Sequence, residues 1–221
     1  MDPSEEAPRP EARWPVVLAI FVAFVLLVVL PPRVRLFPEW ALCLLTAAVL
    51  TPLIAVALRP RNAGWARAER LIVYGFVALI AACNLAMLWE LVVDMIRRSQ
   101  TVDGLELLSS SIAVWAMNVL MFSLLYWELD RGGPALRGGP AAHRPDWLFP
   151  SDQAPPETLE PGWRPQFADY LFLGFSTATA FSTTDGLPLT SRAKLAMMLE
   201  STISLVTLVV VGARAINVLG S

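Results

Sequence analysis

Charged side chains are scarce in this chain of 221 residues, in which Asp, Glu, Lys and Arg together make up 16%. Soluble domains average about 25%, so the composition argues against a soluble domain. A net charge of −2 provides no basic surface for nucleic acid. His143 is the single histidine, and no cysteine pair stands at ligand spacing, so the sequence lacks a zinc motif. We therefore expect no metal, no cofactor and no nucleic-acid partner.

Cysteine is nearly absent as well, and both copies, Cys43 and Cys83, lie in apolar runs. Such cysteines are typical of small buried hydrophobes. The sequence contains no nucleophile elbow, phosphate-binding glycine loop or paired metal motif, which argues against an enzyme. Two neighbouring acids, Glu128 and Asp130, follow a hydrophobic run, and we interpret them as a solvated helix end. The bias toward Arg, Ala, Leu and Val suggests a GC-rich bacterial genome.

Long hydrophobic runs are what the chain has in quantity, since 56% of its residues are hydrophobic. A membrane helix needs roughly 20 apolar residues. We predict an all-α, polytopic membrane bundle in the bacterial inner membrane, with six hydrophobic helices over residues 14–30, 38–58, 71–95, 107–129, 167–181 and 192–219. The fifth covers only 15 residues, so it either spans the bilayer or is re-entrant before a filter-like turn.

Four regions follow from this pattern. Residues 1–13 are rich in Pro and Glu and are expected to be disordered. Residues 14–129 form a four-helix membrane region, 130–166 a Pro/Gly-rich loop, and 167–221 a helix–turn–helix. The loop is long for a segment without periodicity, and its apolar insert Trp147-Leu148-Phe149 predicts that part of it docks back on protein or membrane.

The distribution of basic residues predicts how the helices are oriented in the membrane, because these residues concentrate on the cytoplasmic side. Six spans with a cytoplasmic N-terminus divide the basic residues 11 inside to 6 outside. A re-entrant fifth helix entering from outside gives 5 inside to 12 outside, whereas one entering from the cytoplasm gives 12 to 5. Charge thus favours a cytoplasmic N-terminus but does not separate six spans from a cytoplasmic re-entrant loop.

Polar residues inside the hydrophobic runs are candidates for structural or transport roles. Asn84 and Asn118 lie at matching depth in the third and fourth helices, which predicts an interhelical hydrogen bond. Glu200 lies two turns into the sixth helix, and an ionisable residue there is a functional candidate by default. In a six-span arrangement the acids Glu90, Asp94 and Glu200 have basic partners within reach on the same side, namely Arg97, Arg98 and Arg192.

The segment from Thr177 to Thr190 reads TATAFSTTDGLPLT and resembles the pore-helix and filter segment of potassium channels. The resemblance implies an ion pathway along the backbone and hydroxyls that follow the fifth helix. A potassium filter needs two glycines to aim its carbonyls at the ion, and both are absent here. What remains is a hydroxyl-rich stretch with a carboxylate, namely Ser182, Thr183, Thr184 and Asp185. The alternative is that these hydroxyls bond helix carbonyls and serve packing.

Residues 167–219 as a whole are similar to a family of bacterial integral membrane proteins without an assigned activity, whose C-terminal half resembles the two-helix channel pore. The matching motifs are WELDRGGP at residues 127–134, DWLFP at 146–150, DYLF at 169–172 and the segment just quoted. Two hypotheses follow. The chain is an oligomeric, channel-like protein that passes a monovalent cation or a proton, or it is a non-conducting membrane protein that reuses the pore module to hold a partner.

Overall fold

Helices account for most of the residues that the computed structural model describes, which are 14–29, 47, 51, 63–97, 104–134, 136–137, 143–159, 163–180 and 186–212. They comprise α1 (Trp14–Val29), α3 (Ala63–Arg97), α4 (Gly104–Leu129), α5 (Phe167–Ala180) and α6 (Ser191–Leu205). The expectation of an all-α chain is confirmed. Five of the six expected helices are found, and the prediction for residues 38–58 falls almost entirely outside the described residues.

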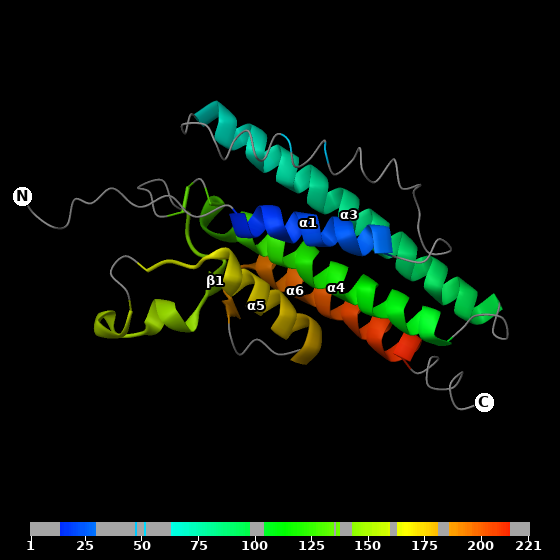
Figure 1. Cartoon of the computed structure of the whole chain (residues 1–221). Coiled ribbons are helices and arrows are strands. Elements are labelled where there is room, and N and C mark those ends of the chain that lie inside the picture. The colour runs from blue at the N-terminus through cyan, green and yellow to red at the C-terminus, as the bar shows by residue number, and fades with distance from the viewer. Residues whose placement is uncertain are drawn as a thin grey trace, which may run out of the picture.

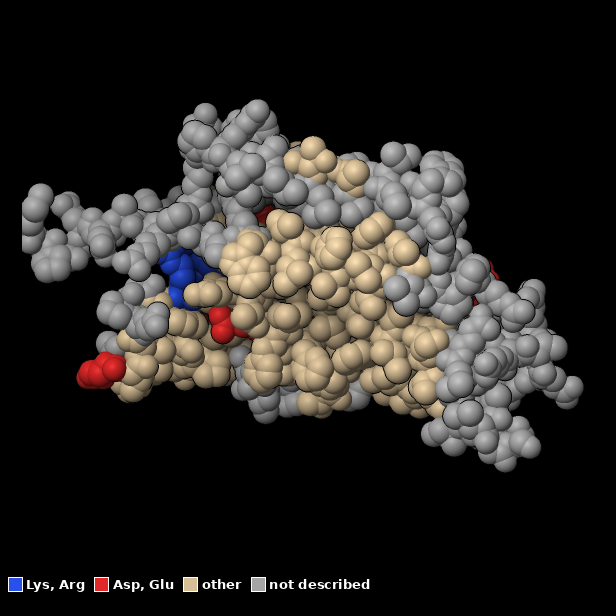
Figure 2. Space-filling view, viewed as in Figure 1, with Lys and Arg blue, Asp and Glu red and all other residues tan. Residues whose placement is uncertain are grey.

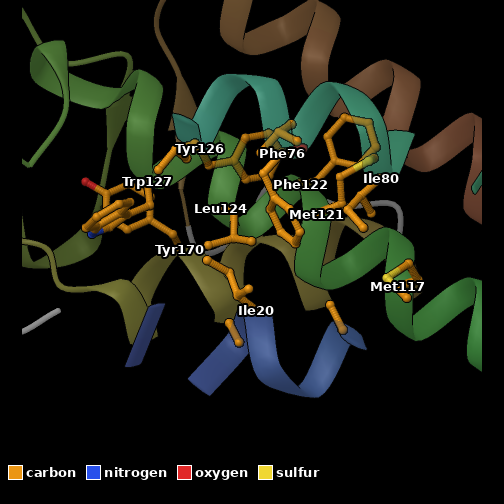
Figure 3. Packing of buried hydrophobic residues seen from close by; sticks show 14 of the residues in the cluster. Ile20, Phe76, Ile80, Met117, Met121, Phe122, Leu124, Tyr126, Trp127 and Tyr170 are labelled. Carbon is orange, nitrogen blue, oxygen red and sulfur yellow. The ribbon is translucent and has the colours of Figure 1, made fainter. Parts of the chain in front are cut away.

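The central helix of the bundle is α4, which runs against the direction of α1, α3, α5 and α6 (Figure 1). We call the end of the bundle where α4 stops and α5 and α6 start the loop end. Side chains from three helices meet in the core (Figure 3): Ile20 from α1, Phe76 and Ile80 from α3, and Met121 and Phe122 from α4. All five are 6% exposed or less.

Two helical segments, Arg70–Glu90 and Leu108–Gly132, are long and apolar enough to cross a membrane. The apolar helix Trp14–Leu26 is shorter. Large hydrophobic side chains also cover the outside of the bundle, among them Trp89, Leu195 and Met198, each more than 60% exposed. Figure 2 shows an uncharged middle of the molecule, with charged side chains gathering toward the loop end. Exposed apolar side chains over a partly polar interior are the arrangement expected in lipid.

The loop after α4 contains one strand and three short 3-10 helices, of which η2 (Asp130–Gly132) follows α4 directly. Strand β1 (Trp147–Leu148) pairs antiparallel with β2 (Leu187–Pro188), so Trp147 lies opposite Pro188. The 3-10 helices η3 (Pro150–Gln153) and η4 (Pro156–Thr158) follow β1. Trp147 is fully buried and Phe149 is 3% exposed. The predicted docking of the apolar insert is therefore confirmed, and its site is the protein interior at the loop end.

Helix α5 enters the bundle and the chain comes back to the end at which it entered. Its first residue, Phe167, packs its ring against Trp127 near the end of α4. The next described residue after α5 is Gly186. A methyl group built on Gly186 would lie 3.0 Å from Leu173 Cδ1 and 3.7 Å from Phe149 Cε1. Strand β2 follows and pairs with β1. Both ends of the segment from α5 to β2 thus lie at the loop end. Entry and return at one end of the bundle is the path that the re-entrant alternative for the fifth helix requires.

The sixth helix departs from regular α geometry in its second half. α6 continues directly into a π-helical segment, η5 (Val206–Val211), where an uninterrupted α-helix over 192–219 was expected. Buried Ser204 and Thr207 flank the change, and the Thr207 hydroxyl donates to the carbonyl of Ile203. Widened π turns are uncommon and are frequently found at functional sites.

Candidate functional site

The buried carboxylates of Asp130 and Asp146 form a hydrogen-bond network at the loop end. Asp130, directly after α4, accepts hydrogen bonds at Oδ1 from the backbone N–H of Asp146 at 2.7 Å and of Trp147 at 3.4 Å. Its Oδ2 accepts from the Tyr170 hydroxyl of α5 at 2.7 Å. Asp130 therefore joins the end of α4, the start of β1 and the first turns of α5.

Asp146 extends this network to the start of α6. Its Oδ1 accepts hydrogen bonds from the Thr190 hydroxyl and from Arg192 Nε, both at 2.6 Å, and Arg192 Nη2 lies 2.5 Å from Oδ2. The hydrogen bonds to Asp146 raise the pKa of the Arg192 guanidinium above its ordinary value. Thr190 also caps α6 by accepting from the N–H of Ala193. We call Asp130, Asp146, Tyr170, Thr190 and Arg192 the clasp.

The interpretation of Glu128 and Asp130 as a solvated helix end is wrong. Their exposed fractions are 2% and 0%. Arg70 from α3 forms an ion pair with Glu128 at 3.2 Å and also donates to the carbonyl of Gly132. Burial is possible because each acid has a partner supplied by a distant part of the chain, which the local sequence pattern does not contain.

A second polar cluster lies in the middle of the bundle, around Asn118 of α4. Asn84 of α3 donates to Asn118 Oδ1 at 3.5 Å, so the predicted hydrogen bond between α3 and α4 is present. Asn118 Nδ2 in turn donates to Ser204 Oγ at 2.8 Å and to the backbone carbonyl of Glu200 at 3.1 Å. All four residues are fully buried. Asn118 therefore connects α3, α4 and α6 at one depth.

Glu200 is the only acid in this cluster within the described residues. Its side chain is fully buried, and Oε2 accepts a hydrogen bond from the Tyr126 hydroxyl of α4. Oε1 is also buried and has no hydrogen-bond partner among the described atoms. Helical side chains lean toward the helix N-terminus, so the carboxyl group of Glu200 points from the depth of Asn118 toward the loop end. We call Glu200, Tyr126, Asn118, Asn84 and Ser204 the Glu200 cluster.

Helix α5 contacts Glu200 through a glycine. A methyl group built on Gly174 would lie 2.5 Å from Ser123 Oγ, 3.3 Å from the carbonyl oxygen of Val119 and 3.4 Å from Glu200 Oε1. A residue with a side chain would therefore hold α5 away from α4 and α6. One turn deeper, Ser201 donates to the carbonyl of Thr177. The sequence pattern gave no sign that Gly174 would face Glu200.

Trp147 covers the Glu200 cluster on the side of the loop end. Its ring centroid lies 4.8 Å from that of Tyr126, and its indole N–H lies 3.2 Å from Met197 Sδ. The backbone N–H of Trp147 is held by Asp130 of the clasp. The two buried polar sets are thus adjacent, with Tyr126 and Trp147 between them.

The sequence-predicted site residues are distributed unevenly in the structure. Glu200, Asn84 and Asn118 fall in one cluster. Among the arginines expected near Glu200, Arg192 binds Asp146 instead, and the acid contacts Tyr126. The hydroxyl-rich stretch Ser182, Thr183, Thr184 and Asp185 lies outside the described residues. Tyr126 and Gly174 were not predicted as site residues.

Comparison of the chain with protein-family models, with curated proteins and with solved structures found no match. The site must accordingly be interpreted from its own geometry. Within the described residues, no group of three or more His, Cys, Asp or Glu side chains is placed to hold a metal ion.

Proposed function

We propose that this chain is an integral protein of a bacterial inner membrane that passes a proton or a monovalent cation, with Glu200 on the pathway. The observation that carries the proposal is the Glu200 carboxyl group, buried between three helices, with one oxygen unpaired beside Gly174 of the re-entrant helix. Intramembrane acids of this kind are costly and mark ion or proton pathways.

The apolar exterior and the polar interior support a membrane location. Trp89, Leu195 and Met198 cover the outside, while Asn118 and Glu200 are buried. Arg70, Arg131 and Arg192 all lie at the loop end, which the positive-inside rule assigns to the cytoplasm. In this orientation α5 enters from the cytoplasm, and the N-terminus lies on the same side.

The pathway proposed here combines α5, α6 and the stretch between them. Non-helical backbone at membrane depth is tolerated where it is buried in protein or lines a wet cavity. Ser182, Thr183, Thr184 and Asp185 follow α5 in the sequence, and in this proposal they supply hydroxyls and a carboxylate to the pathway. The resemblance to the two-helix channel pore agrees with a re-entrant α5 followed by α6, and it carries with it the proposal of a homo-oligomer.

Flux into liposomes tests this proposal. Purified protein should dissipate a gradient of protons or of a monovalent cation, and Glu200→Gln should remove most of that flux. Asp185→Asn should alter it. Glu90→Gln is the matched control, because Glu90 is an exposed glutamate of α3 that is outside the Glu200 cluster. If folded wild-type protein passes neither protons, Na⁺ nor K⁺, the transport proposal is wrong.

A second candidate is a non-conducting membrane protein that binds a partner through the loop. The segment with η3 and η4 extends beyond the helix ends (Figure 1), and Asp152, Gln153 and Glu157 on it are exposed. Deleting residues 138–160 would not test this function, because the deletion also removes the buried Asp146 and Trp147. Substituting Gln153 and Glu157 with alanine is the sharper experiment, and it should abolish partner capture while leaving the fold intact.

A further inference from the structure

The two oxygens of Glu200 are in different surroundings. Oε2 accepts the hydrogen bond from Tyr126, whereas Oε1 faces Gly174 and has no partner among the described atoms. In a neutral carboxylic acid one oxygen accepts and the other carries the proton. The Tyr126 hydroxyl therefore marks Oε2 as the carbonyl oxygen and leaves Oε1 for the proton.

The side chains that hydrogen-bond Glu200 do so as donors. Tyr126 donates to the carboxyl group, and Asn118 directs its N–H groups at the Glu200 carbonyl and at Ser204. A bare metal cation needs several oxygen ligands with free lone pairs. A proton needs only one. This arrangement suits a proton and is unfavourable for an alkali cation.

No charged group balances an ionised Glu200 within the described part of the chain. Tyr126 of α4 is the titratable group in contact with it, and α5 presents Gly174 there. On α6, the helix that carries Glu200, the Arg192 side chain binds Asp146 instead. Burying an unpaired carboxylate is far more costly than burying the neutral acid.

We propose that the species bound at Glu200 is a proton, carried on Oε1, and that this site excludes metal cations. The proposal rests on the proposed function, because it names the species that the pathway carries. Tyr126 is a positioning residue in this account. It fixes which oxygen is protonated by holding the other one.

Infrared spectroscopy of the full-length protein in liposomes tests the proton directly. At neutral pH, wild-type protein should show the carbonyl stretch of a protonated carboxylic acid, with the expected downshift in D₂O. Glu200→Gln should lose this band, and Glu90→Gln should keep it. Tyr126→Phe should shift the band to higher frequency, because Oε2 loses its hydrogen bond; a merely structural tyrosine would leave the band where it is.

Cation replacement separates the two species, and flux separates this inference from the proposed function. Replacing a large organic cation by Na⁺ or K⁺ should leave the band unchanged. A band that disappears in Na⁺ or K⁺, or that is absent from folded wild-type protein, overturns the inference. A stable band without any flux would instead overturn the transport proposal and leave the proton on Glu200. If Glu200→Gln does not fold, Glu200→Asp should move the band rather than abolish it.

Discussion

The clasp and the Glu200 cluster are both polar and both contain buried carboxyl groups, yet their hydrogen-bonding groups are paired to different degrees. In the clasp, all four carboxylate oxygens of Asp130 and Asp146 accept hydrogen bonds, and Arg192 supplies a positive charge. In the Glu200 cluster, one carboxyl oxygen has no partner and no cation is present among the described residues. Where a buried polar network fixes structure, every donor and acceptor is expected to have a hydrogen-bond partner. A buried polar atom without a partner calls for a functional explanation.

The clasp also explains how the start of α5 and the start of α6 are held at one end of the bundle. Its residues come from the end of α4, the loop, the start of α5 and the start of α6, so it fixes both ends of the re-entrant segment at one face. The Glu200 cluster lies deeper and contacts α5 only through Gly174 and its neighbours. Substitutions in the clasp should therefore affect stability, and substitutions at Glu200 should affect transport. The predictions below test this division, from the largest expected effect to the smallest.

The largest effect is expected from Trp147→Ala, because this side chain is fully buried between the two polar sets. Loss of a buried tryptophan should lower the free energy of unfolding by about 3–5 kcal/mol. Denaturation in detergent, followed by circular dichroism, measures it. Trp89→Ala is the matched control, since that indole is 68% exposed on α3, and it should change stability by less than about 1 kcal/mol. Equal losses in the two variants would contradict the assigned role of Trp147.

Asp146→Asn should be next, with a loss of about 2–3 kcal/mol, because it removes the charge from the hydrogen bonds with Thr190 and Arg192. The same denaturation experiment measures this change. Glu157→Gln, an exposed acid of the same loop, should stay within about 0.5 kcal/mol of wild type. If the Asp146 variant is as stable as that control, the clasp does not brace the re-entrant segment.

Gly174→Ala should cost about 1–3 kcal/mol, because the new methyl group would lie 2.5 Å from Ser123 Oγ. Removing that hydroxyl in the double variant with Ser123→Ala should restore part of the loss. A double-mutant cycle therefore gives the coupling between the two positions. Additive effects in the cycle would mean that α5 does not approach α4 at Gly174.

Asn118→Ala should cost about 1–2 kcal/mol and Asn84→Ala about 0.6 kcal/mol, the scale of polar contacts between membrane helices. Asn118 loses three hydrogen bonds, whereas Asn84 loses the single long one at 3.5 Å. Thermal unfolding of the two variants side by side measures the difference. A larger loss of stability in Asn84→Ala than in Asn118→Ala would contradict the central position of Asn118 in the cluster.

How far the sequence predicts this structure depends on whether a feature is local. The helices over 14–30, 107–129 and 167–181 are recovered closely, because apolar runs and glycine or proline breaks mark them. The Asn84–Asn118 contact followed from equal depth. In contrast, the basic residues divide 11 inside to 6 outside for a spanning α5 and 12 to 5 for an α5 that re-enters from the cytoplasm. These two divisions are too similar to distinguish the two topologies.

The partners of the acids could not be predicted from the sequence. Asp146 lies 46 positions from Arg192, and Tyr126 lies 74 positions from Glu200, so neither contact leaves a periodic trace. The six-span arrangement predicts that Arg192 lies near Glu200, whereas in the structure the loop brings Asp146 to Arg192 and the two form an ion pair. Glu128 and Asp130 were misjudged for the same reason, since their partners come from α3 and from the loop.

The most direct test of the division between the two polar sets is proton flux measured beside stability in one variant, Glu200→Gln. The variant should unfold within about 1 kcal/mol of wild type, because glutamine can still accept the Tyr126 hydrogen bond. In liposomes with an imposed pH gradient it should lose the flux that wild type and Glu90→Gln retain. A Glu200→Gln protein that is stable and carries protons at the wild-type rate would contradict the account.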